Sequence, residues 1–261
     1  MVQPGRGLVA KYGVNRSRFF VKPGLVQQTL VFNVARPLFA NNPRLRQAVN
    51  FALDRRALQR AVSTSPLDRR LTDQYLPPSL PGFRDADIYP LEHANLSRAK
   101  ALARGTTRGG KALLYATDRP QPLAAAQVVK RQLAAIGLDV EIVAIPRGGS
   151  DDGRWDLTSN FWGADYLDPY AYINLALDGR FAGKTNGGRF NSPTYNRLMR
   201  QASRLQGPAR YRAYGALDVR LARDAAPLAA LSFLNEPTLV SKRVGCIVLR
   251  PYLDLAAACL K

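Results

Sequence analysis

The chain has 261 residues, of which 38 are Lys or Arg and 19 are Asp or Glu, so its formal net charge is +19. This length accommodates one large domain or two modest ones, and no apolar run approaches the roughly 20 residues that a membrane-spanning helix requires. The first residues, Met1 to Gly7, lack the apolar segment of a signal peptide. The basic balance raises the question of nucleic acid or an anionic surface as a partner.

Arginine supplies most of the positive charge, and its residues are scattered along the chain. The longest runs are pairs such as Arg55-Arg56 and Arg69-Arg70, and there is no RNA-binding aromatic motif or zinc-finger spacing. A solvated basic surface is the favoured interpretation, with no nucleic acid expected as a partner. A basic module that binds nucleic acid or an anionic surface is the alternative function.

Residues suited to catalysis are few. The only histidine, His93, stands beside Glu92 in a polar stretch and fits a surface residue better than a ligand or a general base. The sequence has no Gly-x-Ser-x-Gly elbow, no Walker loop and no His-Glu-x-x-His helix. Neither the histidine nor the two cysteines give a nucleophile–base pair. The sequence therefore predicts a protein that is not an enzyme and has no metal or cofactor.

In chain order, the first predicted elements are two short strand-forming runs, residues 19–21 and 29–32. A helix is expected to begin at Pro43, because proline suits the first helical position and apolar residues then recur at helical spacing. Arg46 and Arg55 are expected on the opposite side of this helix from the apolar residues. The core of the protein should therefore receive only the apolar face.

Residues 63–90 are rich in proline and predict an irregular excursion over the surface. A short helix from Leu96 to Ala103 is expected to follow. The next segments predict a βαβ unit with parallel strands: a strand (Lys111 to Ala116), a helix (Leu123 to Ile136) stopped by Gly137, and a strand (Leu138 to Ile145).

The most informative stretch is 155–169, Trp-Asp-Leu-Thr-Ser-Asn-Phe-Trp-Gly-Ala-Asp-Tyr-Leu-Asp-Pro. Its first half predicts a strand, and its second half predicts a turn before a helix that begins at Pro169 and runs to Leu177. Aromatic faces beside an acid at the carboxyl end of a strand suit a small ligand with a cationic or polar group. The alternative is a pair of core tryptophans with an aspartate that caps the helix.

The remaining segments predict helices from Ser192-Pro193 to Leu205 and from Gly207-Pro208 to about Arg223, then strand-like residues 228–233 and 238–240. Cys246 and Cys259 lie close to the C-terminus. They either form a disulfide, as in an exported protein, or are two unrelated buried thiols.

Several residues are candidates for ligand binding. Trp162 offers an apolar wall, Asp165 a negative charge and Tyr166 a ring with a hydrogen-bonding hydroxyl group. Arg119 follows the first strand of the βαβ unit, at the edge where open α/β sheets place ligand contacts, and its guanidinium suits a carboxylate. A solvent-facing arginine in a proline-stiffened turn is the alternative. The predicted ligand-binding residues are Trp162, Asp165, Tyr166, Arg119, Phe161 and Asn160.

A series of short motifs resembles the C-terminal half of the family 5 extracellular solute-binding proteins, which serve ABC importers of peptides, nickel and related solutes. The motifs occur in the family's order, cover nearly all of the chain after residue 30, and are Phe32-Asn33, Pro37-Leu38-Phe39, residues 46–55, Leu76-Pro77-Pro78, Pro81-Gly82, residues 135–140, residues 162–169, residues 211–214 and Ala226-Pro227-Leu228.

The resemblance implies roles for particular residues. In peptide-binding members the acid of the Trp-x-x-Asp turn pairs with the α-amino group of the peptide, a role that falls here on Asp165, with Trp162 and Tyr166 lining the site. In the dipeptide-binding branch an arginine before a proline holds the peptide carboxylate, and Arg119 matches that position. Ser159 stands where oligopeptide-binding members place an arginine near the ligand.

The resemblance also implies an α/β fold of the type II periplasmic-binding-protein class, with a mixed sheet flanked by helices. Residues 33–226 are expected to form the C-terminal ligand-binding lobe, residues 1–32 the crossover strands from an N-terminal lobe, and residues 227–261 the return segment with the cysteine pair. The chain is expected to be a fragment that lacks most of the first lobe and binds ligand weakly alone.

The implied function is capture of a dipeptide, oligopeptide or similar small solute outside the membrane, in the periplasm or at the cell surface. The implied partners are that solute, the membrane permease of an ABC importer and the missing N-terminal lobe. An extracytoplasmic location agrees with a disulfide between Cys246 and Cys259.

Overall fold

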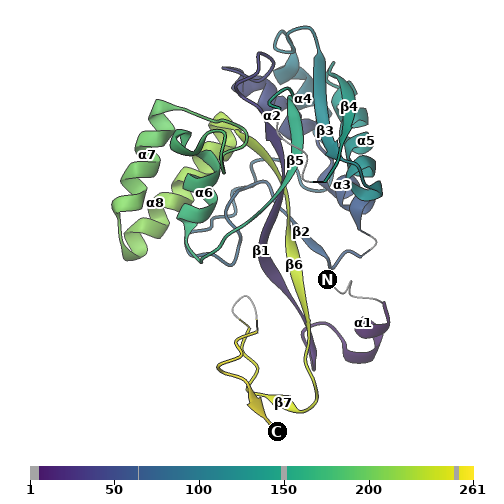
Figure 1. The fold of residues 1–261 in the computed structure, drawn as a ribbon, viewed down its shortest axis with the longest axis vertical. Coiled ribbons are helices and arrows are strands. Elements are labelled where there is room, and N and C mark those ends of the chain that lie inside the picture. The colour runs from purple at the N-terminus through teal and green to yellow at the C-terminus, as the bar shows by residue number, and fades with distance from the viewer. Residues whose placement is uncertain (1–5, 64, 148–151, 250–252) are drawn as a thin grey trace.

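A six-stranded mixed sheet with the order β2-β6-β1-β5-β3-β4 forms the framework of the molecule (Figure 1). The structure is a computed structural model that describes residues 6–63, 65–147, 152–249 and 253–261. The strands of the sheet are β1 (Phe19–Phe32), β2 (Arg69–Leu71), β3 (Lys111–Thr117), β4 (Asp139–Ile145), β5 (Leu157–Gly163) and β6 (Leu228–Leu239). Two short strands, β7 (Val244–Gly245) and β8 (Cys259–Leu260), pair separately.

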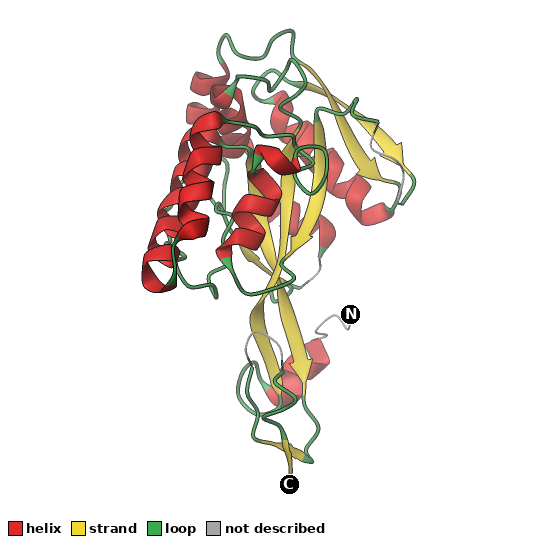
Figure 2. Ribbon diagram, turned by 60° about the vertical axis from the view of Figure 1, so that its left-hand side comes forward, coloured by secondary structure: helices red, strands yellow, loops and turns green. Residues whose placement is uncertain are grey.

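Helices cover both faces of the sheet (Figure 2). The α-helices are α1 (Arg6–Tyr12), α2 (Pro43–Ala52), α3 (Arg55–Val62), α4 (Leu96–Ala103), α5 (Pro120–Ala134), α6 (Pro169–Leu177), α7 (Pro193–Arg204) and α8 (Gly207–Arg220). A 3-10 turn, η1 (Gly179–Phe181), follows α6, and a π-helical turn, η2 (Leu221–Ala225), follows α8. Within the described ranges, none of the helices is long and apolar enough to cross a membrane.

The alternation of side chains along β1 separates two packing regions. Leu30 and Phe32 belong to the larger core, which α2, α3, α4 and α5 complete. A second core lies among α6, α7 and α8 and includes Ala230 and Phe233 of β6. A shift in the register of β1 and β6 beside Gln28 and Thr29 brings these two β6 residues to the same core. The two cores bury opposite faces of one sheet.

The strands β1 and β6 are longer than their neighbours and leave the body of the molecule as a two-stranded ribbon (Figure 1). The ribbon pairs Phe19 with Leu239 at its far end and Val31 with Leu228 inside the body. Helix α1 and the small sheet of β7 and β8 lie at the far end of the ribbon. There Cys246 and Cys259 form a disulfide with a Cα–Cα distance of 5.3 Å, which confirms the predicted bond.

Most predicted elements are confirmed. The helices at Leu96–Ala103 and Pro169–Leu177 agree residue for residue, and β3 and β4 pair in parallel around α5 as the βαβ unit requires. Helix α5 begins at Pro120 rather than Leu123, because its prolines fit the first turn. The two runs expected near the N-terminus are one continuous strand, β1, and α3 was not predicted at all.

The prediction that Arg46 and Arg55 face solvent is wrong. Both are buried, with 5% and 1% of their surface exposed. The guanidinium of Arg46 donates to the carbonyl oxygens of Phe39 and Ala225, while that of Arg55 donates to those of Thr72 and Ala230 among others. Burial lowers the pKa of each to about 10 despite nearby groups that favour the charge. Arg46 thus connects α2 with η2, the turn that precedes β6. Arg55 connects α3 with β6.

The prediction of a surface excursion for residues 63–90 is wrong for its central part. Gln74, Tyr75 and Leu76 are all at most 2% exposed. The carboxylate of Asp218 on α8 accepts hydrogen bonds from the backbone amides of Tyr75 and Leu76. A buried segment without regular structure needs such partners for its backbone, and α8 provides them.

Candidate functional site

A pocket of about 650 Å³ lies between the sheet and the helical region of α6–α8. Residues of β1, β5 and α6 form part of its wall. The loop that carries Lys184, Thr185, Gly187 and Gly188 forms another part, and further aromatic and aliphatic side chains complete it. Its size falls in the range of pockets that hold small molecules. Within the described ranges, no group of three or more His, Cys, Asp and Glu is placed to hold a metal ion.

The pairing of β1 with β5 decides which side chains enter this pocket. Trp162 stands opposite Gln27 and Asn160 opposite Thr29, and all four border the pocket. Phe161 points to the other face, where the guanidinium of Arg69 lies 5.8 Å from its ring centre. In the described structure β5 pairs with β3 only as far as Thr158, and Phe161, three residues further on, also borders the pocket.

Trp162 joins β5 to the helix that follows. Its indole N–H donates to the carbonyl oxygen of Ala171 on α6 at 2.9 Å, and its ring packs against the core of the α6–α8 region. The neighbouring Tyr172 hydroxyl donates to the carbonyl oxygen of Leu25 on β1 at 2.7 Å. The indole face is therefore held as a fixed wall of the pocket.

The turn after β5 contains two carboxylates, those of Asp165 and Asp168, and they have different contacts. Asp168 caps α6, accepting from the backbone amide of Tyr170 at 2.8 Å, and forms two hydrogen bonds with the guanidinium of Arg210 on α8. Burial raises the pKa of Asp168, but the Arg210 and Tyr170 hydrogen bonds outweigh it, so the net shift is downward. Asp168 is thus the capping residue that the alternative interpretation anticipated.

Asp165 lies exposed in the same turn, and within the described structure it makes no hydrogen bond or ion pair. Tyr166 beside it is 48% exposed. Neither residue borders the pocket of this chain. They lie past the carboxyl end of β5, one turn beyond the Trp162 wall.

Arg119 also lies outside the pocket lining. It occupies the N-cap position of α5, its side chain is exposed, and it makes no capping hydrogen bond. Because β3 and β5 are parallel, the turns that follow them emerge at the same edge of the sheet. Arg119 and Asp165 therefore share that edge, and the β1–β6 ribbon leaves the body from it, since β1 begins where β5 ends.

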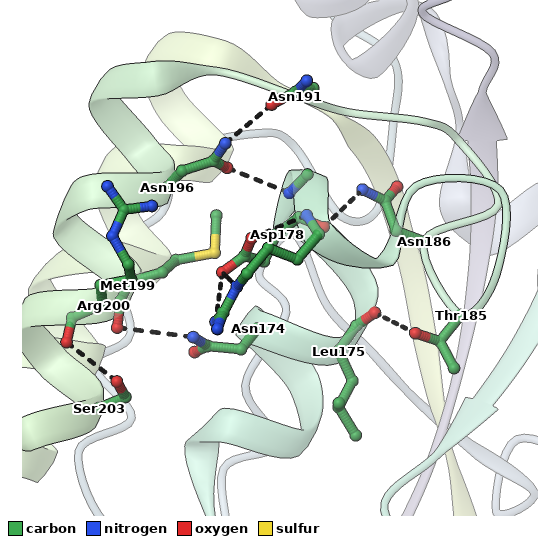
Figure 3. Close-up of polar contacts among 12 residues, drawn as sticks. Asn174, Leu175, Asp178, Thr185, Asn186, Asn191, Asn196, Met199, Arg200 and Ser203 are labelled. Carbon is green, nitrogen blue, oxygen red and sulfur yellow. Dashed lines mark hydrogen bonds and ion pairs between the residues drawn. The ribbon is translucent and has the colours of Figure 1, made fainter.

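The loop from Asp178 to Asn191 is fixed by a network of polar side chains (Figure 3). Asn186, which is 1% exposed, donates to the carbonyl oxygens of Asp178 and Phe190. Thr185 donates to the carbonyl oxygen of Leu175 on α6 at 2.6 Å. Asn196 of α7 accepts from the amide of Gly179 at 3.1 Å. The loop is thereby held in one conformation beside the pocket.

Lys184, Thr185 and Gly188 border the pocket but were not among the residues predicted from the sequence. A Cβ atom at Gly188 would lie 2.8 Å from the carbonyl oxygen of Phe32, so the loop packs directly on β1. The sequence signal for this loop is its glycine content, which marks a backbone that approaches another segment closely. That signal does not say which segment it approaches.

Tyr75 borders the pocket, and a buried carboxylate holds its backbone in position. Its amide donates to Asp218 of α8 at 2.9 Å, and the side chain of Gln74 donates to the same carboxylate at 3.1 Å. Burial raises the pKa of Asp218 to about 7, although these hydrogen bonds oppose the shift. The titratable carboxyl group of Asp218 thus holds the backbone of a residue that borders the pocket.

Solved structures share this architecture. HbpA2 from Haemophilus parasuis superposes with a TM-score of 0.82 at 21% identity, covering 93% of this chain and 50% of that one. A dipeptide-binding protein from Pseudoalteromonas sp. SM9913, in complex with Met-Leu, gives a TM-score of 0.72 at 23% identity, covering 99% and 53%. The fold is therefore that of the type II periplasmic binding proteins, as predicted.

Sequence comparison gives the family. The chain is 25% identical over 221 residues to the probable ABC transporter periplasmic-binding protein SapA of Escherichia coli strain K12, a match that covers 80% of this chain and 40% of that protein. The chain spans less than half the length of this relative and of SapA from Salmonella typhimurium. The model of the bacterial extracellular solute-binding proteins, family 5 middle region, matches residues 8–184. The chain belongs to the family 5 bacterial extracellular solute-binding proteins.

Proposed function

We propose that this chain forms the ligand-gripping lobe of an ABC-importer receptor that captures peptides or a similar small solute outside the membrane. In this proposal residues 33–226 are the lobe, and residues 1–32 and 227–261 are the crossover segments to a second lobe. The receptor then delivers its solute to a membrane permease. Relatives support the cargo class, since Helicobacter pylori DppA is described in complex with the peptide STSA and Escherichia coli MppA as a murein tripeptide binding protein.

The observation that carries this proposal is the position of the pocket. It opens beside β5, whose carboxyl end shares an edge with the turn after β3 and with the departing β1–β6 ribbon. A second lobe joined through that ribbon would close over this edge, which is the hinge closure used by two-lobed binding proteins. Trp162 then supplies one wall of the closed site.

Asp165 is proposed to pair with the α-amino group of a peptide. Its carboxylate is exposed and, in the described structure, has no hydrogen-bonding or ionic partner that would compete with a ligand. The peptide is proposed to contact Asn160, Phe161 and Tyr166 close to Asp165. It is also proposed to contact Arg119, at the carboxyl end of β3 on the same edge of the sheet. Closure would remove these groups from water and strengthen each contact.

The test compares trialanine with N-acetyl-trialanine, followed by NMR through the indole N–H signals up to millimolar peptide. Asp165→Asn should weaken binding of trialanine about tenfold, because a charge-assisted hydrogen bond is lost, and leave the acetylated peptide unaffected. Asp85→Asn, at an exposed aspartate outside the pocket, is the matched control.

The proposal is contradicted if neither peptide moves the indole signals, or if the Asp85 variant loses as much affinity as the Asp165 variant. The alternative function predicts a different result. A module for nucleic acid or an anionic surface would bind short DNA with an affinity that falls steeply as salt rises.

A further inference from the structure

We infer that Lys184 recognises an anionic group of the ligand, so that the solute class is a peptide or related molecule with a free carboxylate. The inference rests on the function proposed above and names the part of the ligand that this chain selects. It assigns a specificity role to a residue in the loop between η1 and α7.

The first argument is the charge of the pocket. Among the described residues that border it, Lys184 is the only charged one, and no aspartate or glutamate offsets it. The remaining wall consists of aromatic rings such as that of Trp162, aliphatic side chains such as that of Val31, and neutral polar groups such as that of Gln27. A single cation in such a surrounding attracts anions more strongly than the same cation in open water.

The second argument is the rigidity of the backbone that carries Lys184. Its amide donates to the carbonyl oxygen of Phe181 at 2.9 Å, and the next residue, Thr185, is bonded to α6. The buried Asn186 then bonds to the carbonyl oxygen of Asp178 (Figure 3). It also bonds to the carbonyl oxygen of Phe190, which closes the loop. The stem of the lysine therefore starts from a fixed point, which reduces the ordering cost when a ligand binds.

The third argument is that the ammonium group is available. Lys184 is exposed, and in the described part of the chain it makes no ion pair or side-chain hydrogen bond. The carboxylate nearest in sequence, Asp178, is already engaged by the guanidinium of Arg180 at 2.8 Å. The charge of Lys184 is thus not neutralised by an ion pair within the described part of the chain.

The experiment compares trialanine with trialaninamide, which differ only in the charge at the C-terminus and keep the same free amine. On the native chain we expect trialaninamide to bind about three- to tenfold more weakly, as for a partly exposed ion pair. Lys184→Met should abolish this difference, and Lys184→Arg should retain it. Lys130→Met, on α5 at the opposite face of the sheet, is the matched control and should behave as the native chain.

The outcomes separate the two claims. Equal binding of the two peptides to the native chain overturns the role of Lys184 and leaves the proposed function intact. Loss of discrimination in the Lys130 variant to the same extent also overturns it, because the effect then follows net charge rather than position. Absence of binding by both peptides contradicts the proposed function, and the inference falls with it.

Discussion

Gly187 and Gly188 are adjacent in the pocket loop and have opposite steric surroundings. A Cβ atom at Gly187 meets no atom within 4 Å, whereas one at Gly188 would lie 2.8 Å from the Phe32 carbonyl oxygen and 3.0 Å from a methyl group of Val31. The first position borders open pocket space, and the second is the contact that seats the loop on β1. Gly187 therefore has room for a larger side chain, whereas Gly188 is required for the packing of the loop on β1.

We expect Gly188→Ala to lower the free energy of unfolding by about 1–3 kcal/mol, since the backbone of β1 cannot move aside without disturbing the sheet. Gly187→Ala should change it by less, because the new methyl group enters free space. Urea denaturation of both variants checks this. Equal losses in the two variants would show that the loop does not pack on β1 as described.

The buried arginines show where sequence reasoning reaches its limit at the residue scale. Arg46 and Arg55 occupy positions that a helical pattern assigns to a solvated face, and the pattern contains no sign of burial. Their partners include the carbonyl oxygens of Ala225 and Ala230, which are more than 170 positions away in the chain. A charged residue can be buried only where such acceptors converge, and that convergence is a property of the tertiary fold.

Among the helices and strands, the predictions that the structure confirms rest on local features of the sequence. Proline at the first helical position and a side-chain cap predict α2 and α6, and the spacing of apolar runs predicts the βαβ unit. Strand β1 was predicted in two pieces because Pro23 and Gly24 interrupt it; its pairing with β6 includes Pro23 and resumes at Gln27 after a shift in register. The pocket loop could not be foreseen for the same reason, since its position depends on β1, α6 and α7 together.

The contact between α6 and α8 includes the pair of Asp168, which caps α6, and Arg210 of α8. Their side chains are only 23% and 16% exposed, and the guanidinium also donates to the carbonyl oxygen of Ser203 at 2.7 Å. We expect Asp168→Asn and Arg210→Met each to lower the free energy of unfolding by about 1–3 kcal/mol.

A double-mutant cycle on these two positions checks the interaction itself. A coupling energy of about 1 kcal/mol or more is expected for a two-pronged, partly buried pair. Additive losses would mean that each side chain acts alone, through the cap for Asp168 and the backbone for Arg210.

Asp218 makes the stability of the α8 contact depend on pH. Because burial raises its pKa from 3.8 to about 7, the folded chain holds a proton there that the unfolded chain releases above about pH 4. The contribution of this group is complete below the unfolded pKa, declines as pH rises and is lost as pH passes through 7. The stability that this group contributes should therefore fall between about pH 4 and pH 7.

Denaturant unfolding at several pH values between 4 and 7 measures this effect. The expected slope approaches about 1.4 kcal/mol per pH unit from this group. Asp218→Asn lacks the titrating group and should flatten the slope, whatever constant cost the substitution adds. A native-like slope in the variant would assign the pH dependence to other residues.

At the scale of the whole molecule, the body and the far end of the ribbon are held by different forces. The body has two apolar cores that bury opposite faces of the sheet. The C-terminal segment beyond β6 is tied by the pairing of β7 with β8 and by the disulfide of Cys246 and Cys259. Leu255 and Leu260 in this segment are each 77% exposed, so little apolar burial supports it.

We therefore expect reduction of the disulfide to release the C-terminal segment without unfolding the body. A disulfide that closes a loop of this size stabilises by about 3 kcal/mol, mainly through the entropy of the open chain, and here the gain applies to a segment with few apolar contacts of its own. Limited proteolysis with and without reductant should reveal new cleavage after residue 240, and amide exchange in β7 and β8 should accelerate. The main thermal transition should stay in place in both the reduced chain and the Cys246→Ser, Cys259→Ser double variant. A transition lowered equally in both would mean that the ribbon end and the body unfold as one cooperative unit.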